Sequence, residues 1–350
     1  MENAVTGMNE QLSGFLIFGL LVWLVRGICI ERMGCMSEYR DAVDDVLREV
    51  KKAVVGKGDV IGKIMMAILA KGHVLVEDIP GTGKTTMALA FSKAMGLMEK
   101  RVQFTPDVLP ADLTGFTVYQ KASESFVYQP GAVMCNLLLA DEINRTSPKT
   151  QSALLEAMEE RQVTVDGVTR SVGNPFVVIA TENPVGSAGT QLLPEAQVDR
   201  FMICVNMGYP TVKEEVEILK RNQMGRTTDA VKRVMSAQWL LQAQEEVENI
   251  YVHDVIYTYI AQLAKKTREM EWIAMGLSPR GAVAMTAMAR ADAYLKGRSY
   301  VVPEDVAEVF SCTAMHRIQL STKAKVGHIQ KEDVLEKVLE EVRKPSVSKR

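Results

Sequence analysis

The amino-acid sequence predicts an α/β domain, with a parallel sheet flanked by helices, followed by an all-α domain. Short apolar runs at Leu137–Ala140 and Phe176–Ala180 are nearly continuous, which is typical of strands buried on both faces of a parallel sheet. Helical patterns such as Pro148–Glu160 alternate with these runs. Beyond Pro210 the strand signals fade, and residues 212–328 have a helical pattern with few breaks. The first two observations predict the sheet, and the third predicts the helical domain.

The composition is that of an ordinary globular protein. The chain has 350 residues, of which 47% are hydrophobic and 24% are charged, which excludes disorder, collagen-like repeats and a polytopic membrane protein. Its length favours more than one domain. The formal net charge of −2 provides no basic field for nucleic acid, so no sequence-specific nucleic-acid partner is expected. The 5 cysteines are scattered without a CxxC pair, which favours the reducing cytoplasm.

Residues 1–36 form an apolar N-terminal segment that differs from the rest of the chain. Leu12–Ile30 is mostly apolar, but Arg26 interrupts it, and a membrane-spanning helix needs about 20 apolar residues. Three explanations stay open. The segment is a membrane anchor with the remaining chain in the cytoplasm, an extra helix docked on the protein, or the result of an over-extended start, with translation beginning at Met33 or Met36.

The remaining chain divides into three further parts. Residues 37–209 begin with amphipathic helices and continue through predicted strands at His73–Val76, Arg101–Phe104 and the two runs above. Two hairpins interrupt this domain, at Phe116–Val133 and at Val163–Arg170, where Asp-Gly predicts a type I′ turn. Residues 210–330 form the helical domain, and residues 331–350 form a C-terminal helix and tail.

The segment between the strand at His73–Val76 and the next helix has the composition of a phosphate-binding loop. Such a loop wraps backbone N–H groups around phosphate oxygens, and the helix after it directs its positive end at them. Lys84 would add a charge for the β- and γ-phosphates of ATP, and Thr85 would bind Mg²⁺. The usual motif begins with glycine where this chain has Asp78. The whole predicted loop is Pro80, Gly81, Thr82, Gly83, Lys84, Thr85 and Thr86.

A carboxylate pair follows the strand Leu137–Ala140, as the second half of a nucleotide site requires. Asp141 would contact Mg²⁺, and Glu142 would orient and polarise the attacking water. An Asp-Glu pair alone is more often a solvated strand end. Its place after a buried strand, 57 residues beyond Lys84, favours the functional interpretation.

Three polar residues further along the chain complete the candidate set. Asn183 follows the strand at 176–180 and can hydrogen-bond the γ-phosphate or the attacking water. Arg200 follows the sheet region, and Arg280 begins a helix of the second domain. Taken singly, each has a common structural explanation: a turn before proline for the asparagine, and surface ion pairs for the arginines. Their order matches an asparagine sensor, an arginine that acts on a neighbouring subunit, and a lid sensor.

This series resembles the AAA+ ATPases and, more narrowly, the MoxR family. The narrower resemblance covers roughly Ser37–Val326 and rests on long, specific stretches. These are Phe104–Gly115, Asp141–Arg145, Gln151–Arg161 and Leu193–Phe201. Asp78 and Glu182 depart from the commonest residues of the family, and the family pattern does not account for Leu12–Ile30.

The resemblance implies a role for each candidate residue. Val55 and Gly56 would approach the adenine, Arg200 would reach the neighbouring subunit's nucleotide, and Arg280 would couple ATP to lid movement. The hairpin at Phe116–Val133 would be the family's insert, and Val163–Arg170 the hairpin before the sensor strand. Members of the family form hexameric rings and act as chaperone-like ATPases, often with a partner that contains a von Willebrand factor A domain.

These observations favour an ATP-driven machine that remodels partner proteins as a homo-oligomer. Two alternatives stay open. One is a nucleotide-gated scaffold with little turnover. The other is a nucleic-acid motor, which the balanced charge and the low aromatic content of 6% disfavour.

Overall fold

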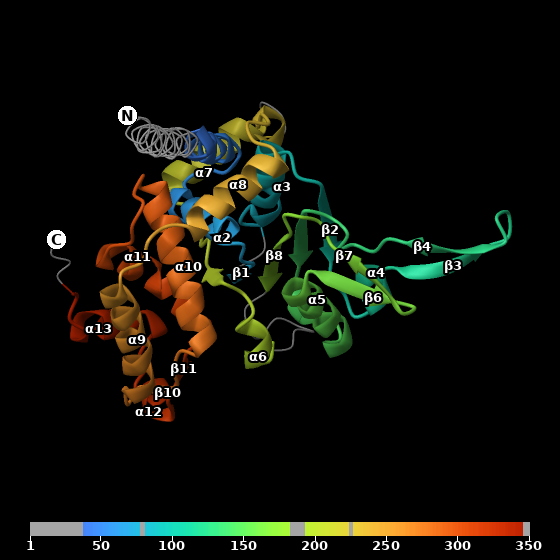
Figure 1. The fold of residues 1–350 in the computed structure, drawn as a ribbon. Helices are drawn as coiled ribbons and strands as arrows, with labels where there is room; N and C mark the ends of the chain where they lie inside the picture. The colour runs from blue at the N-terminus through green and yellow to red at the C-terminus, as the bar shows by residue number, and fades with distance from the viewer. Residues whose placement is uncertain (1–37, 78–80, 183–192, 224–226, 346–350) are drawn as a thin grey trace, which may run out of the picture.

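The computed structural model describes residues 38–77, 81–182, 193–223 and 227–345 (Figure 1). Its centre is a parallel sheet in the order β2-β5-β8-β1-β9. The strands are β1 (Val74–Glu77), β2 (Glu99–Gln103), β5 (Leu137–Asp141), β8 (Val177–Glu182) and β9 (Ile203–Val205). The sheet confirms the predicted fold class, although β9 was not predicted.

Strands β1, β5, β8 and β9 are buried on both faces of the sheet, since alternate residues of a strand point to opposite sides and both sets are buried. On β1, Val74 and Val76 belong to one hydrophobic core and Leu75 to the other. Helix α3 (Lys84–Met95) packs in the first core, and α5 (Pro148–Glu160) packs in the second. Helices therefore cover both faces of the sheet, as the continuous apolar runs predict.

The smaller elements of the α/β part connect the strands. Residues 38–53 are helical. The other elements are α2 (Gly58–Leu69), α4 (Pro110–Thr114), the 3₁₀ turn η1 (Ile143–Arg145) and α6 (Glu195–Val198). Because all five strands are parallel, the carboxyl ends of β1, β5 and β8 lie at one edge of the sheet. The last residues of these strands, Glu77, Asp141 and Glu182, thus come together at that edge.

The two predicted hairpins are both present. Strands β3 (Phe116–Gln120) and β4 (Ser125–Gln129) pair antiparallel, and Figure 1 shows this hairpin extending away from the body of the protein. Strands β6 (Gln162–Val165) and β7 (Val168–Ser171) form the second hairpin. Asp166 and Gly167 at its turn both have positive φ, as the Asp-Gly sequence predicts.

Helices dominate the chain after β9. They are α7 (Val212–Gln223), η2 (Thr227–Ala230), α8 (Ala237–Glu248), α9 (Asp254–Glu269), α10 (Pro279–Leu295), α11 (Pro303–Ala314), α12 (Thr322–Val326) and α13 (Lys331–Glu341). A short ribbon of β10 (Ile273–Met275) and β11 (Gln319–Leu320) adds to the expected helices. One hydrophobic core runs from these helices to the sheet. The division of the chain into domains near residue 210 falls between β9 and α7 and stays a prediction.

Some predicted features lie outside the described residues. They are residues 1–36 with the apolar run Leu12–Ile30, the predicted site residues Pro80 and Asn183, and Asp78, where the loop motif departs from glycine. Among the residues that the structure describes, no helix combines the length and apolar character needed to cross a bilayer.

Candidate functional site

The loop after β1 has the backbone of a tight anion-binding turn. Gly81 has φ of +88° and Gly83 has φ of +90°, in the left-handed region that favours glycine. Gly83 is also the N-cap of α3, so the loop ends at the first turn of that helix, whose N–H groups have no acceptor within the helix. Lys84 is the first residue of α3. Positive partial charge, backbone donors and a lysine thus gather at one point, as phosphate binding requires.

A cavity of about 310 Å³ lies beside this loop. Five predicted residues line it, namely Val55, Gly81, Thr82, Gly83 and Thr86. The rest of the lining was not predicted and includes Pro210, Ile218, Leu219 and Arg221, which come from the chain after β9. Both parts of the protein therefore enclose the cavity. Its apolar wall suits a flat aromatic ring such as adenine, next to the polar loop.

Gly56 does not line the cavity, but it permits close contact beside Val55. Its φ is +74°, and the Glu214 side chain of α7 occupies the space that a Cβ atom would need. Lys57 Nζ donates to the Tyr209 carbonyl over 3.1 Å. These contacts hold the segment around Val55 against the start of α7. Glycine at position 56 thus allows the Glu214 side chain to approach the backbone closely.

Asp141 is almost fully buried, with 5% of the residue exposed, and two side chains contact it. Arg101 Nε donates to its Oδ2 over 2.7 Å, and Thr181 Oγ1 donates to its Oδ1 over 3.3 Å. Arg101 and Thr85 line the same small cavity of about 130 Å³. Sequence reasoning missed Arg101, because an arginine in a strand gives no motif.

The residues around Asp141 fit a magnesium ion that arrives with a nucleotide. Mg²⁺ prefers oxygen ligands, and it usually takes one or two carboxylates with substrate phosphates and water. A buried carboxylate and the Thr85 hydroxyl are donors of this type. Among the described residues, no group of three or more His, Cys, Asp or Glu side chains is arranged to hold a metal ion without a nucleotide.

Glu142 adopts a strained backbone conformation at the end of β5. Its φ is +58°, which is costly for a residue other than glycine. Its N–H donates to Thr181 Oγ1 over 2.9 Å, and Arg145 Nη1 donates to its Oε2 over 2.7 Å. Thr181 therefore links the backbone of Glu142 to the carboxylate of Asp141. This bend turns Glu142 out of the strand at the edge that carries the loop.

Arg200 and Arg280 come together at a different place. Both form ion pairs with Glu159 of α5, and the Arg200 Nη1–Glu159 Oε2 distance is 3.0 Å. All three line a cavity of about 330 Å³, and its lining shares no residue with that of the loop cavity among the residues that the structure describes. We expected Arg280 to bind the nucleotide and to couple ATP to lid movement. In this chain the first turn of α10 lies against Glu159 and Arg280 is not part of the loop-cavity lining, so its role stays a prediction.

The cavity at Glu159, which we call the arginine cavity, is rich in cations. Lys71, Arg161, Arg200, Arg280 and Arg317 contribute positive charge to its lining, whereas the carboxylates in the lining are Glu159 and Asp199. An anion with several negative oxygens suits such a wall.

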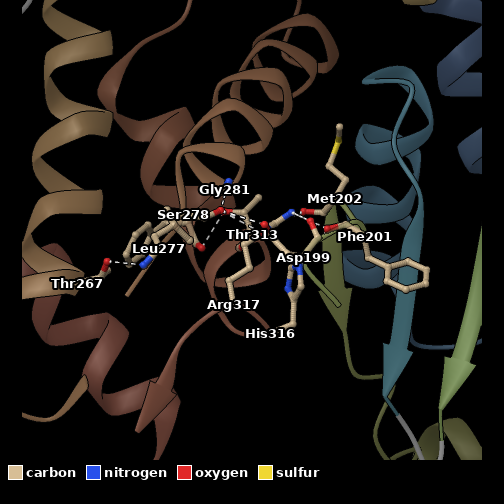
Figure 2. A network of polar contacts seen from close by, with 11 residues as sticks. Asp199, Phe201, Met202, Thr267, Leu277, Ser278, Gly281, Thr313, His316 and Arg317 are labelled. Atoms are coloured by element: carbon tan, nitrogen blue, oxygen red, sulfur yellow. Dashed lines mark hydrogen bonds and ion pairs between the residues drawn. The ribbon is translucent and has the colours of Figure 1, made fainter. Parts of the chain in front are cut away.

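A polar network joins the backbones that carry the two arginines (Figure 2). Asp199, next to Arg200, accepts from Ser278 Oγ over 3.1 Å and from Arg317 Nε over 2.7 Å. Arg317 also donates to the carbonyls of Phe201 and Met202. Ser278 is the N-cap of α10 and accepts from Gly281 N. The start of α10 is thus fixed to the segment before β9.

A second carboxyl pair lies where β1 and β8 end. Glu77 and Glu182 are direct partners in the parallel register. Burial, and then the neighbouring charge and hydrogen bond of Glu77, raise the pKa of Glu182 to about 8, while Lys331 acts in the opposite direction. At neutral pH, Glu182 is therefore protonated and donates to Glu77. Sequence reasoning noted Glu182 only as a departure from the family.

The fold and the loop define the class of the protein, a nucleotide-binding AAA-type ATPase with a lid. Residues 73–203 match the family described as the ATPase family associated with various cellular activities (AAA), and residues 265–338 match the AAA lid domain. The first match contains the loop and all five strands of the sheet except the last two residues of β9.

The chain belongs to the MoxR family of AAA+ ATPases. It is 41% identical over 309 residues to Chaperone MoxR1 of Mycobacterium tuberculosis, covering 86% of this chain and 81% of the relative. It is 43% identical to the uncharacterized protein YeaC of Bacillus subtilis, covering 89% and 98%. The crystal structure of a Cytophaga hutchinsonii protein described as a candidate ATPase superposes with a TM-score of 0.84 at 35% identity, covering 90% and 98%.

Proposed function

We propose that this protein hydrolyses ATP at sites shared between subunits and uses the energy to remodel partner proteins. One observation carries the proposal. The phosphate-binding loop and the arginine pair belong to two separate cavities of one chain. A second copy that places its arginine cavity against the loop would complete the site. Assembly into a closed ring lets every subunit both bind a nucleotide and serve its neighbour.

Each candidate residue of the loop side has a role that its position supports. The turn at Gly81–Thr86 with Lys84 binds the phosphates, and Val55 with the apolar residues of α7 holds the adenine. Asp141 and Thr85 would hold Mg²⁺, which would neutralise phosphate charge. Glu142 orients the attacking water and accepts its proton, after its side chain exchanges Arg145 for that water.

The arginine cavity of one subunit stabilises the negative charge that develops on the ATP phosphates of its neighbour during hydrolysis. Arg200 and Arg280 of one subunit contact the ATP phosphates bound by its neighbour, where charge develops as the γ-phosphoryl group leaves. We keep Asn183 as the sensor of the γ-phosphate. The lid role of Arg280 changes accordingly, since it couples the helical part to the neighbour's ATP.

The remaining expectations are part of the same proposal. The ring is a hexamer, a protein with a von Willebrand factor A domain is a partner, and the ATPase body is cytoplasmic. The name of Chaperone MoxR1 supports the chaperone-like role.

Hydrolysis is tested by measuring ATP binding and steady-state phosphate release in parallel. We expect Glu142→Gln to bind ATP as the unmodified protein does and to release phosphate at least about 100-fold more slowly, because general-base catalysis contributes about 10²–10⁴-fold. Glu160→Gln is the control, since Glu160 is exposed at the end of α5. A protein that binds ATP but releases phosphate no faster than its Glu142→Gln variant is instead the nucleotide-gated scaffold.

A further inference from the structure

One carboxylate, that of Glu159, bridges the two arginines. Its Oε2 pairs with Arg200 and its Oε1 pairs with Arg280. Arg200 Nη1 donates in addition to the carbonyl of Leu155, one turn earlier on α5, over 2.9 Å. Arg200 comes from the α/β part and Arg280 from the helical part, 121 residues from Glu159. Two charges from distant parts of the chain thus share one counter-ion.

The backbone around Glu159 is anchored from several sides. The carbonyl of Met158 accepts from His73 Nε2 over 3.1 Å, and His73 Nδ1 accepts from Val178 N. Burial lowers the pKa of His73 to about 4, so this ring is neutral and bridges α5 to the sheet. Arg161 Nη2 donates to the carbonyl of Lys71 over 2.7 Å. These hydrogen bonds therefore fix the position of the end of α5, from which the Glu159 side chain extends.

The backbones that carry the arginines do not depend on Glu159. The Asp199–Ser278–Arg317 network already joins them (Figure 2). What Glu159 adds is the direction of the two guanidinium groups. Folding stability gives little reason for this arrangement, because the side chains of Glu159, Arg200 and Arg280 are 37%, 34% and 44% exposed and such ion pairs contribute little.

Charge decides what can replace Glu159 as the partner of the arginines. A carboxylate carries one negative charge, whereas the terminal phosphates of ATP carry more and offer oxygens that suit two guanidinium groups. When those phosphates approach the arginine cavity, the guanidinium groups can exchange Glu159 for them with a small rotation. Until then, Glu159 keeps the two guanidinium groups side by side and neutralises one of their two positive charges.

We propose that Glu159 is a positioning residue of the shared ATP site, which holds Arg200 and Arg280 side by side and then yields them to the neighbouring subunit's ATP. This inference rests on the proposed function. It has two opposing consequences. Loss of the Glu159 charge removes a competitor for the arginines, so ATP binds more tightly. It also leaves the arginines unoriented, so turnover slows.

The test uses mixed assemblies in which only one kind of shared site can work. Arg200→Ala subunits keep Glu142, and Glu142→Gln subunits keep Arg200, so activity in the mixture comes from Arg200→Ala subunits served by Glu142→Gln neighbours. Glu159→Gln is then placed either in the arginine-donating Glu142→Gln subunit or in the Arg200→Ala subunit. Glu160→Gln in the arginine-donating subunit is the matched control.

We expect Glu159→Gln in the arginine-donating subunit to lower KM for ATP about two- to fivefold, the range that corresponds to one exposed ion pair, and to lower kcat about tenfold. In the other subunit it changes neither value, and the midpoint of thermal unfolding matches that of the control. A mixture without activity overturns the shared site and this inference with it. An active mixture in which Glu159→Gln behaves like Glu160→Gln, or acts equally from either subunit, overturns the inference alone.

Discussion

Lys84 combines a full charge with the first position of a helix that follows two left-handed glycines. We expect Lys84→Ala to weaken ATP binding about 100-fold, because a charged hydrogen bond contributes up to about 3 kcal/mol and the phosphates lose their nearest fixed cation. Calorimetry measures this loss directly. Lys121→Ala, at the exposed turn of the β3–β4 hairpin, is the control. Undiminished ATP binding by Lys84→Ala would show that the loop does not bind the phosphates.

Glu182 makes stability depend on pH in an unusual direction for a carboxyl group. Its pKa is about 8 in the folded protein and close to 4.5 in the unfolded chain. The folded state therefore binds the extra proton between these values, and stability falls as pH rises through this window. Glu182→Gln replaces the carboxyl group with an amide, which can still donate a hydrogen bond to Glu77 but carries no titrating proton.

We expect the melting temperature of the unmodified protein to fall relative to that of Glu182→Gln from about pH 5 to about pH 8 and to change little beyond it. Thermal unfolding of the two proteins in matched buffers tests this expectation. A difference that stays constant across the range would mean that Glu77 and Glu182 do not share a proton.

At the residue scale, the sequence revealed groups with a motif and missed groups without one. Lys84, Asp141 and Glu142 follow glycines or a buried strand, so the sequence singled them out, and their roles stay predictions. Arg101 and Glu159 were not, because a single charged residue on a strand or helix is usually solvated. Their significance comes only from the partners that folding brings within hydrogen-bonding distance.

At the scale of the element, the loop before α3 depends on backbone conformation rather than on packing. Among the residues that the structure describes, none has an atom within 4 Å of the position of a Cβ atom at Gly83, so we attribute the cost of Gly83→Ala to backbone conformation. We expect a loss of about 1–2 kcal/mol in the free energy of unfolding. Gly62→Ala is the matched control, because Gly62 lies inside α2 and no other described part of the chain comes within 4 Å of its Cβ position. Alanine there should add about 0.5–1 kcal/mol to the free energy of unfolding.

Urea unfolding of both variants measures whether each substitution lowers or raises the free energy of unfolding. A Gly83→Ala protein as stable as the unmodified chain would show that the loop tolerates a left-handed alanine or changes conformation.

The elements themselves were predictable where local patterns are strong. Buried strands, amphipathic helices and the Asp-Gly hairpin follow from periods of two and 3.6 residues and from turn chemistry. Strand β9 was missed because it has three residues, and β10 and β11 were missed because they are short and lie among helices. Such short strands depend on partners distant in sequence.

At the scale of the whole molecule, the proposed function assigns two incomplete halves of an ATPase site to one chain. The loop cavity is enclosed by residues before β1 and after β9, and the arginine cavity lies elsewhere, with Glu159 as the counter-ion of both arginines. The family resemblance predicted that Arg200 acts on a neighbouring subunit, but nothing in the sequence indicated that Arg280 lies in the same cavity as Arg200. The ion pairs of both arginines with Glu159 of α5 reveal it.

The most direct test of the account is phosphate release by mixtures of Arg200→Ala and Glu142→Gln subunits across a range of molar ratios. Each variant alone should be nearly inactive, and mixing should restore turnover to a maximum at an intermediate ratio, because an intact Glu142 and an intact Arg200 then meet at the same ATP. Full turnover by either variant alone, or a mixture no more active than the sum of its parts, would contradict a site shared between subunits.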